Sequence, residues 1–178
     1  MKWTQTSPAI LPVTYQQAAA HLRLVDDQDR DYVKDLIAAA TEFAETALGA
    51  SLITRTVTAT FNQGEPLYLP RGPLISLTSV TQFGGHLIAS PNCTIEGHGN
   101  ADLLVIQANA WTAPLIVVYQ AGYGPTVNDV PADIRMAIRM HTATLYENRE
   151  SVADKSLIPV PHSLGDFYRL KSRQTGTG

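Results

Sequence analysis

Three aspartates at alternate positions, Asp27, Asp29 and Asp31, are the first residues whose types and spacing could do chemistry. Carboxylates at the first, third and fifth positions open the calcium-binding loop of an EF-hand. That loop also needs a glycine at its sixth position and a glutamate at its twelfth, where this sequence has Tyr32 and Ala38. The aspartates are therefore interpreted as a solvated turn and a helix cap, and no metal site is predicted.

The sequence Gly122-Tyr123-Gly124 follows a predicted strand, as the glycines of a dinucleotide-binding loop do. However, there is no third glycine at position 127, and Pro125 interrupts the approach to the next helix. Reversal of the chain explains the segment better than phosphate binding. The sequence also lacks the G-x-S-x-G, G-K-[ST], H-E-x-x-H and C-x-x-C signatures, so it predicts no catalytic residue and no cofactor.

His141, Glu147 and Arg149 could be drawn as a catalytic cluster near the end of a helix. His141 falls on an apolar stripe, where a core or interface histidine is expected more often than a catalytic one. Glu147 and Arg149 lie where they can cap the helix or pair with a neighbouring subunit. Cys93, the one cysteine, is interpreted as a small buried apolar residue. A small enzyme of unknown type remains the less favoured alternative.

The charge balance limits the classes of partner. With 13 Lys and Arg against 16 Asp and Glu, the formal net charge is -3, and charged residues make up only 16% of the chain. This balance argues against a dominant phosphate-binding face, because tight binding to a nucleic-acid backbone needs clustered cations. A thinly charged surface leaves room for contact with other protein. Weak acidity suits a conduit for DNA as well as a protein indifferent to DNA.

The elements that must position these residues begin with an extended leader, which ends at Pro12-Val13-Thr14, and two helices. A helix over 15–22 follows Thr14 as its N-cap and contains an alanine run. A second helix over 30–48 begins after Asp29, carries an apolar stripe at three- and four-residue steps, and stops at Gly49. No apolar run resembles a signal peptide or reaches the ~20 residues of a membrane span, so we expect a soluble protein of the cytoplasm.

The segment over about 50–124 is predicted to form strands. Threonines at 54, 56, 58 and 60 alternate with other residues from Ile53 to Phe61, which is the two-residue period of a half-solvated strand. A strand predicted over 77–83 reaches the pair Gly84-Gly85, which predicts a hairpin turn, and short apolar runs follow up to Gln120. Because no helix intervenes, we expect antiparallel pairing in a small twisted sheet or barrel-like sandwich.

A third helix is predicted over 132–148, with Pro131 at its start. Its apolar residues form two stripes, which are Ile134, Ala137, Ile138, His141 and Leu145 on one side and Met136, Met140, Ala143 and Tyr146 on another. Since one core needs only one stripe, Met136, Met140 and Tyr146 are predicted to bind a partner.

The segment 151–178 is interrupted by Pro159, Pro161 and Gly165, yet it is too apolar for a plain linker. We interpret it as an extended C-terminal docking arm that orders on assembly. The arm residues predicted to bind partners are Leu157, Ile158, Val160, Phe167 and Tyr168.

Several segments, in their order and spacing, resemble those of phage head-tail connector proteins, the neck adaptors of long-tailed phages and phage-derived elements. The segments are Pro12-Val-Thr with the first helix and His21-Leu-Arg-Leu24, Ala44-Glu-Thr-Ala-Leu-Gly49, Leu69-Pro-Arg-Gly-Pro-Leu74 before Leu77-Thr-Ser-Val80, Tyr119-Gln-Ala-Gly-Tyr-Gly124, Val130-Pro131, and Leu145-Tyr-Glu-Asn-Arg-Glu150. The likeness spans residues 12 to about 150.

The resemblance implies a structural virion protein of the neck, assembled in the cytoplasm of a host bacterium. Its subunits would form a ring, usually twelvefold, between the portal protein and a tail-side neck protein. DNA would pass through without sequence-specific binding. The family has no catalytic residues to carry over. Another neck or tail-completion protein of the virion is the main alternative.

The matched motif positions are expected to be structural. Arg71, Gly72 and Pro73 would shape a turn between two strands, Gly122 and Gly124 a loop, and Pro131 a helix start. The expected fold class is α+β, with a three-helix body, a central antiparallel β-rich insertion and an extended C-terminal arm. Residues 1–150 would form one connector domain and 151–178 the docking arm.

Overall fold

The computed structural model describes residues 1–8, 10–89, 92–98, 101–106, 111–148, 165 and 167–168. It confirms the α+β class. The chain divides into two compact units. The β unit comprises Met1–Ala9, Gly49–Pro125 and Arg173–Gly178, and the helical unit comprises Ile10–Leu48 and Thr126–Ser172. Whether 1–150 behaves as one connector domain remains a prediction.

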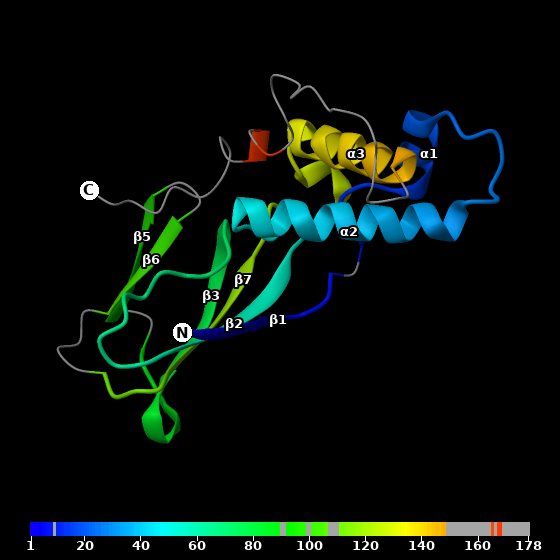
Figure 1. Cartoon of the computed structure of the whole chain (residues 1–178). Helices are drawn as coiled ribbons and strands as arrows, with labels where there is room; N and C mark the ends of the chain where they lie inside the picture. Colours follow the sequence, from blue (N-terminus) through cyan, green and yellow to red (C-terminus); the bar gives the residue numbers. More distant parts are fainter. Residues whose placement is uncertain are drawn as a thin grey trace. The chain divides into compact units, whose positions relative to one another are not determined.

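The helical unit contains the three predicted helices (Figure 1). They are α1 at Tyr15–Leu22, α2 at Arg30–Leu48 and α3 at Ala132–Glu147. A short 3-10 turn, η3 at Val127–Asp129, precedes α3. The predicted bounds of α1 and α2 are confirmed, and α3 ends one residue earlier than predicted.

Local hydrogen bonds explain where the first two helices begin and end. The Thr14 hydroxyl accepts from the Gln17 amide at 3.3 Å, and the Gln17 side chain accepts from the Thr14 amide at 3.1 Å, which forms a capping box. In α2 the Val33 amide donates to the Asp29 carbonyl at 2.9 Å. Gly49 ends α2 with a φ of +62°, a left-handed conformation that favours glycine.

The core of the helical unit forms along one side of each long helix. Its fully buried members are Val33, Ile37, Ala40, Ala44 and Leu48 of α2, with Ile134, Ala137 and Ile138 of α3. The predicted first stripe of α3 is thus the one that faces the core.

The β unit holds a five-stranded antiparallel sheet in the order β1-β2-β7-β3-β4 and a separate hairpin, β5-β6. Figure 1 shows β1, β2, β7 and β3 side by side. The strands are β1 at Lys2–Gln5, β2 at Arg55–Phe61, β3 at Leu74–Gln82, β4 at His86–Leu87, β5 at Cys93–His98, β6 at Ala101–Ile106 and β7 at Leu115–Ala121.

One face of the five-stranded sheet is buried and the other is open. Val57, Ala59 and Phe61 of β2 and the alternate residues of β7 enter a core that includes Leu67, Leu69 and Leu104. The alternation predicted for β2 is confirmed, because its threonines lie half-exposed on the opposite face. Cys93 is half-buried beside the core instead of fully buried, and burial raises the pKa of its thiol.

Two features of the sheet differ from the expectation. Lys2–Gln5, expected to be part of an extended leader, pairs with β2 as an edge strand. Strand β3 begins at Leu74, three residues before the predicted start, and its pairing with β7 shifts register at Ile75 and Thr78. Each shift leaves one residue of β3 without an opposite partner on β7, which is a β-bulge.

The two-glycine turn also takes a different form. A short 3-10 turn, η1 at Phe83–Gly85, joins β3 to β4, with Gly84 and Gly85 at φ values of +83° and +80°.

Within the described residues, no helix has the length and apolar character needed to cross a membrane.

Candidate functional site

The described residues do not assemble a catalytic cluster from the histidine and acid of α3. His141 is half-buried with its ring centroid 4.9 Å from that of Phe43, and burial lowers the pKa of His141 below its usual 6.5. Glu147 is exposed and lies 1.7 helical turns further on, on a different side of α3. Arg149 lies outside the described residues. Among the residues that the structure describes, no three His, Cys, Asp or Glu side chains gather to hold a metal ion.

The predicted motif residues do come together in the β unit. The Ser51 amide donates to the Gly72 carbonyl at 2.9 Å, and the Gly122 amide donates to the Pro73 carbonyl at 2.9 Å. The Thr54 amide donates to the Gly124 carbonyl at 3.0 Å. Two of the quoted motifs, 69–74 and 119–124, and the segment 49–54 that begins at the last residue of a third motif therefore form one site, which we call the motif junction.

Arg71 is held in the motif junction through its backbone. The Tyr119 hydroxyl accepts from the Arg71 amide and donates to the Arg71 carbonyl, both at 3.1 Å. The Arg71 guanidinium lies 4.8 Å from the centre of the Trp3 ring, in a cation–π contact that ties β1 to the junction. The expected turn at Arg71 therefore also connects β7, through Tyr119, with β1, through Trp3.

Asp102 of β6 borders the motif junction, and sequence reasoning missed it. It is buried, and its carboxylate accepts from the Leu74 amide at 3.0 Å. Its backbone carbonyl accepts from the Leu69 amide at 2.9 Å. Asp102 thus fastens the β5-β6 hairpin to the segment 69–74. Its sequence surroundings, an aspartate before an apolar run, gave no signal of this long-range contact.

Gly122 fits the junction because it has no side chain. Its φ is +142°, and a Cβ built on it would lie 2.7 Å from the Thr54 nitrogen and 2.8 Å from the Ile53 carbonyl carbon. Real Cβ atoms essentially never approach backbone so closely. The glycine therefore allows the end of β7 to pass against the segment before β2.

Pro131 lies in the helical unit, at the N-cap position of α3, where its carbonyl accepts from the Arg135 amide at 3.1 Å. This is one position before the helical interior, and it still fits the expected role as a helix start.

The residues of the second predicted stripe of α3 lie in two different environments. Met136 and Met140 are 44% and 48% exposed and lie one turn apart on the outer side of the helix. Tyr146 is half-buried, its hydroxyl donates to the Asp29 carboxylate, and its ring lies 6.1 Å from that of Tyr32. The two methionines are therefore open to a partner, whereas Tyr146 connects α3 to the start of α2.

Two arm residues, Phe167 and Tyr168, lie within the helical unit. Tyr168 is 1% exposed, with its ring 5.9 Å from Phe43 and 5.6 Å from the half-buried Phe167. Burial raises the pKa of Tyr168 to about 12. Tyr168 thus lies in the single chain's own packing, and its binding of a partner remains a prediction. The predicted arm residues Leu157, Ile158 and Val160 lie outside the described residues.

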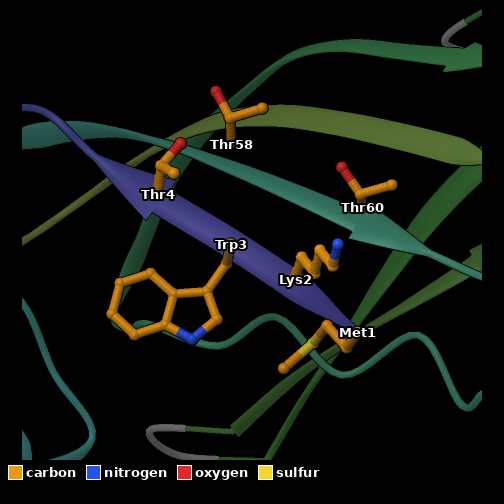
Figure 2. Close-up of a pocket in the computed structure, with 6 residues that line it drawn as sticks. All are labelled: Met1, Lys2, Trp3, Thr4, Thr58 and Thr60. Atoms are coloured by element: carbon orange, nitrogen blue, oxygen red, sulfur yellow. The ribbon is translucent and has the colours of Figure 1, made fainter.

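The open face of the sheet carries a surface that sequence reasoning did not identify. A hollow of about 490 Å³ at the β1 edge is lined by Met1, Lys2, Trp3, Thr4, Thr58 and Thr60. Figure 2 shows Lys2, Thr4, Thr58 and Thr60 rising from one side of the two strands, while the Trp3 ring leaves from the other. The pairing of Lys2 with Thr60 and of Thr4 with Thr58 agrees with this view.

At the opposite edge of the sheet, the β3-β4 turn projects two apolar side chains. Phe83 is 64% exposed and Leu87 is 73% exposed. The turn is anchored at its base, because the Phe83 amide donates to the Thr112 carbonyl at 3.1 Å and the Gln82 side chain accepts from the Thr112 amide at 3.1 Å. Large apolar side chains on an anchored turn are typical of a contact surface.

Comparison with known proteins shows the fold. A chain of the virion of a native gene transfer agent (GTA) particle is similar over 100% of this chain and 99% of its own, with a TM-score of 0.78 and 19% identity. Chains in the neck of an empty GTA particle, computed with C6 symmetry, and in the neck of a native GTA particle, computed with C12 symmetry, have TM-scores of 0.76 and 0.71. Both are 17% identical to this chain, with the same coverage.

No protein-family model and no curated protein matches the sequence. The expected resemblance to neck proteins is therefore confirmed at the level of the fold.

Proposed function

We propose that this chain is a structural subunit of a virion neck, where identical copies form an adaptor ring between the portal protein and a tail-side neck protein. The ring is twelvefold in the particle and surrounds the path of the DNA during completion of packaging and during ejection. It is assembled in the cytoplasm of the host bacterium. The chain contributes contacts and shape and performs no catalysis.

One observation carries the proposal: the fold matches, from end to end, chains in necks computed with C6 and C12 symmetry. The match covers 100% of this chain and 99% of the other. The order of the sequence motifs and their meeting in the motif junction add independent support.

The surface chemistry is compatible with a ring around DNA. On the open face of the sheet, the residues that pair across the strands are mainly Thr, Ser and Gln, with Ile116 and Val118 and a single cation at Lys2. Hydroxyl and amide groups do not displace the counterions of a duplex as clustered Lys and Arg do. Such a surface allows DNA to move past without being held.

The experiment that tests the proposal is electron microscopy of the purified chain, alone and after co-production with the portal protein encoded by the same genetic element. We expect closed rings of a single rotational order, and twelvefold rings seated on the portal. A portal from an unrelated phage serves as the control and should not acquire the ring. Strictly monomeric particles in both preparations, with no binding to the cognate portal, would contradict the proposal.

A further inference from the structure

A ring of more than two identical subunits requires two different surfaces on each chain. In a cyclic ring every contact is heterologous, so a patch on one subunit meets another patch on the next. The β unit presents two such patches at the opposite edges of one sheet: the hollow over β1 and the turn that carries Phe83 and Leu87.

The two patches lie at the same level along the strands. Pairing across the five strands defines a cross-strand row that runs from Lys2 through Thr60, Ile116 and Thr81 to Leu87. Residues directly opposite each other in an antiparallel sheet share a face, so the whole row belongs to the open face. Lys2 at one end lines the hollow, and Leu87 at the other end is the more exposed of the two apolar side chains at the β3-β4 turn.

The backbone of β1 is also open on its outer side. The Thr6 amide donates to the Thr56 carbonyl, which makes Thr6 and Thr56 a hydrogen-bonded pair. Hydrogen-bonded pairs alternate along an antiparallel ladder, so the amides and carbonyls of Trp3 and Gln5 point away from β2. The edge can therefore offer hydrogen bonds to a neighbouring chain as well as a hollow for its side chains.

The chemistry of the two ends is complementary. Leu87 and Phe83 are uncharged and apolar, and on the open face the hollow offers the methyl groups of its three threonines and the stem of Lys2, while the Trp3 ring lies on the other side of β1. No carboxylate lines the hollow, and Lys2 is its one charged side chain. A lysine stem can cover an apolar side chain while its ammonium group stays in water.

We propose that, in the ring, the β3-β4 turn of one subunit docks on the β1 edge of the next, with Leu87 entering the hollow. This inference rests on the proposed ring and identifies which surfaces close it. The contact is head to tail, because the two edges lie at opposite ends of the row, roughly 20 Å apart for strands spaced about 4.8 Å from one another. The occupant of the hollow is thus a second copy of this chain.

Directed cross-linking tests the contact. In a Cys93→Ala background, which removes the native thiol, Leu87→Cys and Thr58→Cys are introduced together and treated with a short bis-maleimide under the conditions that give rings. The double variant should yield a ladder of dimers, trimers and larger species. Each single variant should form no covalent cross-link, because a heterologous contact brings only one cysteine to each interface.

The outcomes separate this inference from the proposed function. Rings visible by microscopy without a ladder would overturn the docking and leave the neck function standing. Dimers from a single variant, with no larger species, would show a two-fold contact and overturn the head-to-tail arrangement. The absence of both rings and cross-links would contradict the ring itself.

A second measurement covers the case in which the cysteines alter folding. Leu87→Lys should lower ring assembly about tenfold or more, since it places a second positive charge beside Lys2 in the hollow, without changing the melting temperature of the chain. Ile75→Lys is the matched control, because Ile75 is an exposed aliphatic residue as well but lies on a bulge of β3 outside the row. Equal assembly of the two variants would overturn the docking.

Discussion

At the scale of single residues, Gly122 shows most directly how a motif constrains this fold. It lies in the motif junction with its missing Cβ directed at the backbone of Ile53 and Thr54, where no side chain can move aside. Backbone cannot yield as a flexible side chain can. The position is therefore fixed by two independent conditions, a positive φ and a close approach.

Gly122→Ala is expected to lower the free energy of unfolding by about 3 kcal/mol or more, or to prevent folding. Chemical denaturation followed by circular dichroism measures the effect. Gly64→Ala is the control, because Gly64 has a φ of +81° but nothing within 4 Å of an added Cβ, so only the backbone cost of about 1 kcal/mol applies. Equal losses in the two variants would show that the close approach is absent.

Sequence reasoning identified Gly122 as a loop residue but did not predict its close approach to the segment before β2. The loop was predicted from Gly122, Gly124 and Pro125, because glycine and proline mark reversals of the chain. The contact with the segment before β2 could not be predicted, since it joins residues almost 70 positions apart and depends on the register of two strands. Asp102 was missed for the same reason.

At the scale of elements, the helices were predicted closely and the edge strand was not. Helices α1 and α2 carry their own signals, namely the capping pair Thr14 and Gln17 and the stop at Gly49. Strand β1 has the sequence Lys-Trp-Thr-Gln, which shows no apolar alternation, and it becomes a strand only by pairing with β2 more than 50 residues away. Bulges at Ile75 and Thr78 hid the start of β3, because an extra residue breaks the two-residue period.

The aromatic packing of Tyr168 on α2 leads to a prediction for the arm. Tyr168→Ala should lower the free energy of unfolding of the isolated chain by about 3 kcal/mol, because it empties a buried ring site beside Phe43. Tyr168→Phe should change it by less than about 1 kcal/mol, since the buried hydroxyl has no hydrogen-bond partner among the described residues. Thermal and chemical denaturation of the monomer give both values.

The same pair of variants distinguishes packing within the chain from docking on a partner. If Tyr168 acts only in assembly, Tyr168→Ala will leave monomer stability unchanged and reduce ring formation instead. A loss of monomer stability establishes that at least this part of the arm is ordered before assembly.

At the scale of the whole molecule, the exposed methionines of α3 are the predicted contact residues that the structure leaves open. Met136→Glu with Met140→Glu should leave the melting temperature within about 2 °C, because both side chains are near half exposure and no core is emptied. Binding to the portal or ring assembly should fall at least about tenfold, since two charges would enter an apolar contact. Mass photometry and portal pull-down measure the two effects.

The control adds the same charge elsewhere in the helical unit. Ala38→Glu with Ala39→Glu places two carboxylates on the exposed side of α2 and should leave assembly unchanged. If both double variants assemble normally, the outer side of α3 is not a contact surface. If both fail, the effect is one of net charge and not of a particular patch.

The two ends of the segment Gly49–Pro125 lie side by side, and this determines where its length can change. Arg55 pairs with Ala121, and the Tyr123 amide donates to the Leu52 carbonyl at 3.3 Å. The residues near the start and the end of this segment are therefore held next to each other by backbone hydrogen bonds. Extra residues in loops far from this pairing do not alter the separation of Arg55 and Ala121. These loops can therefore change in length without moving the two points at which the segment 49–125 begins and ends.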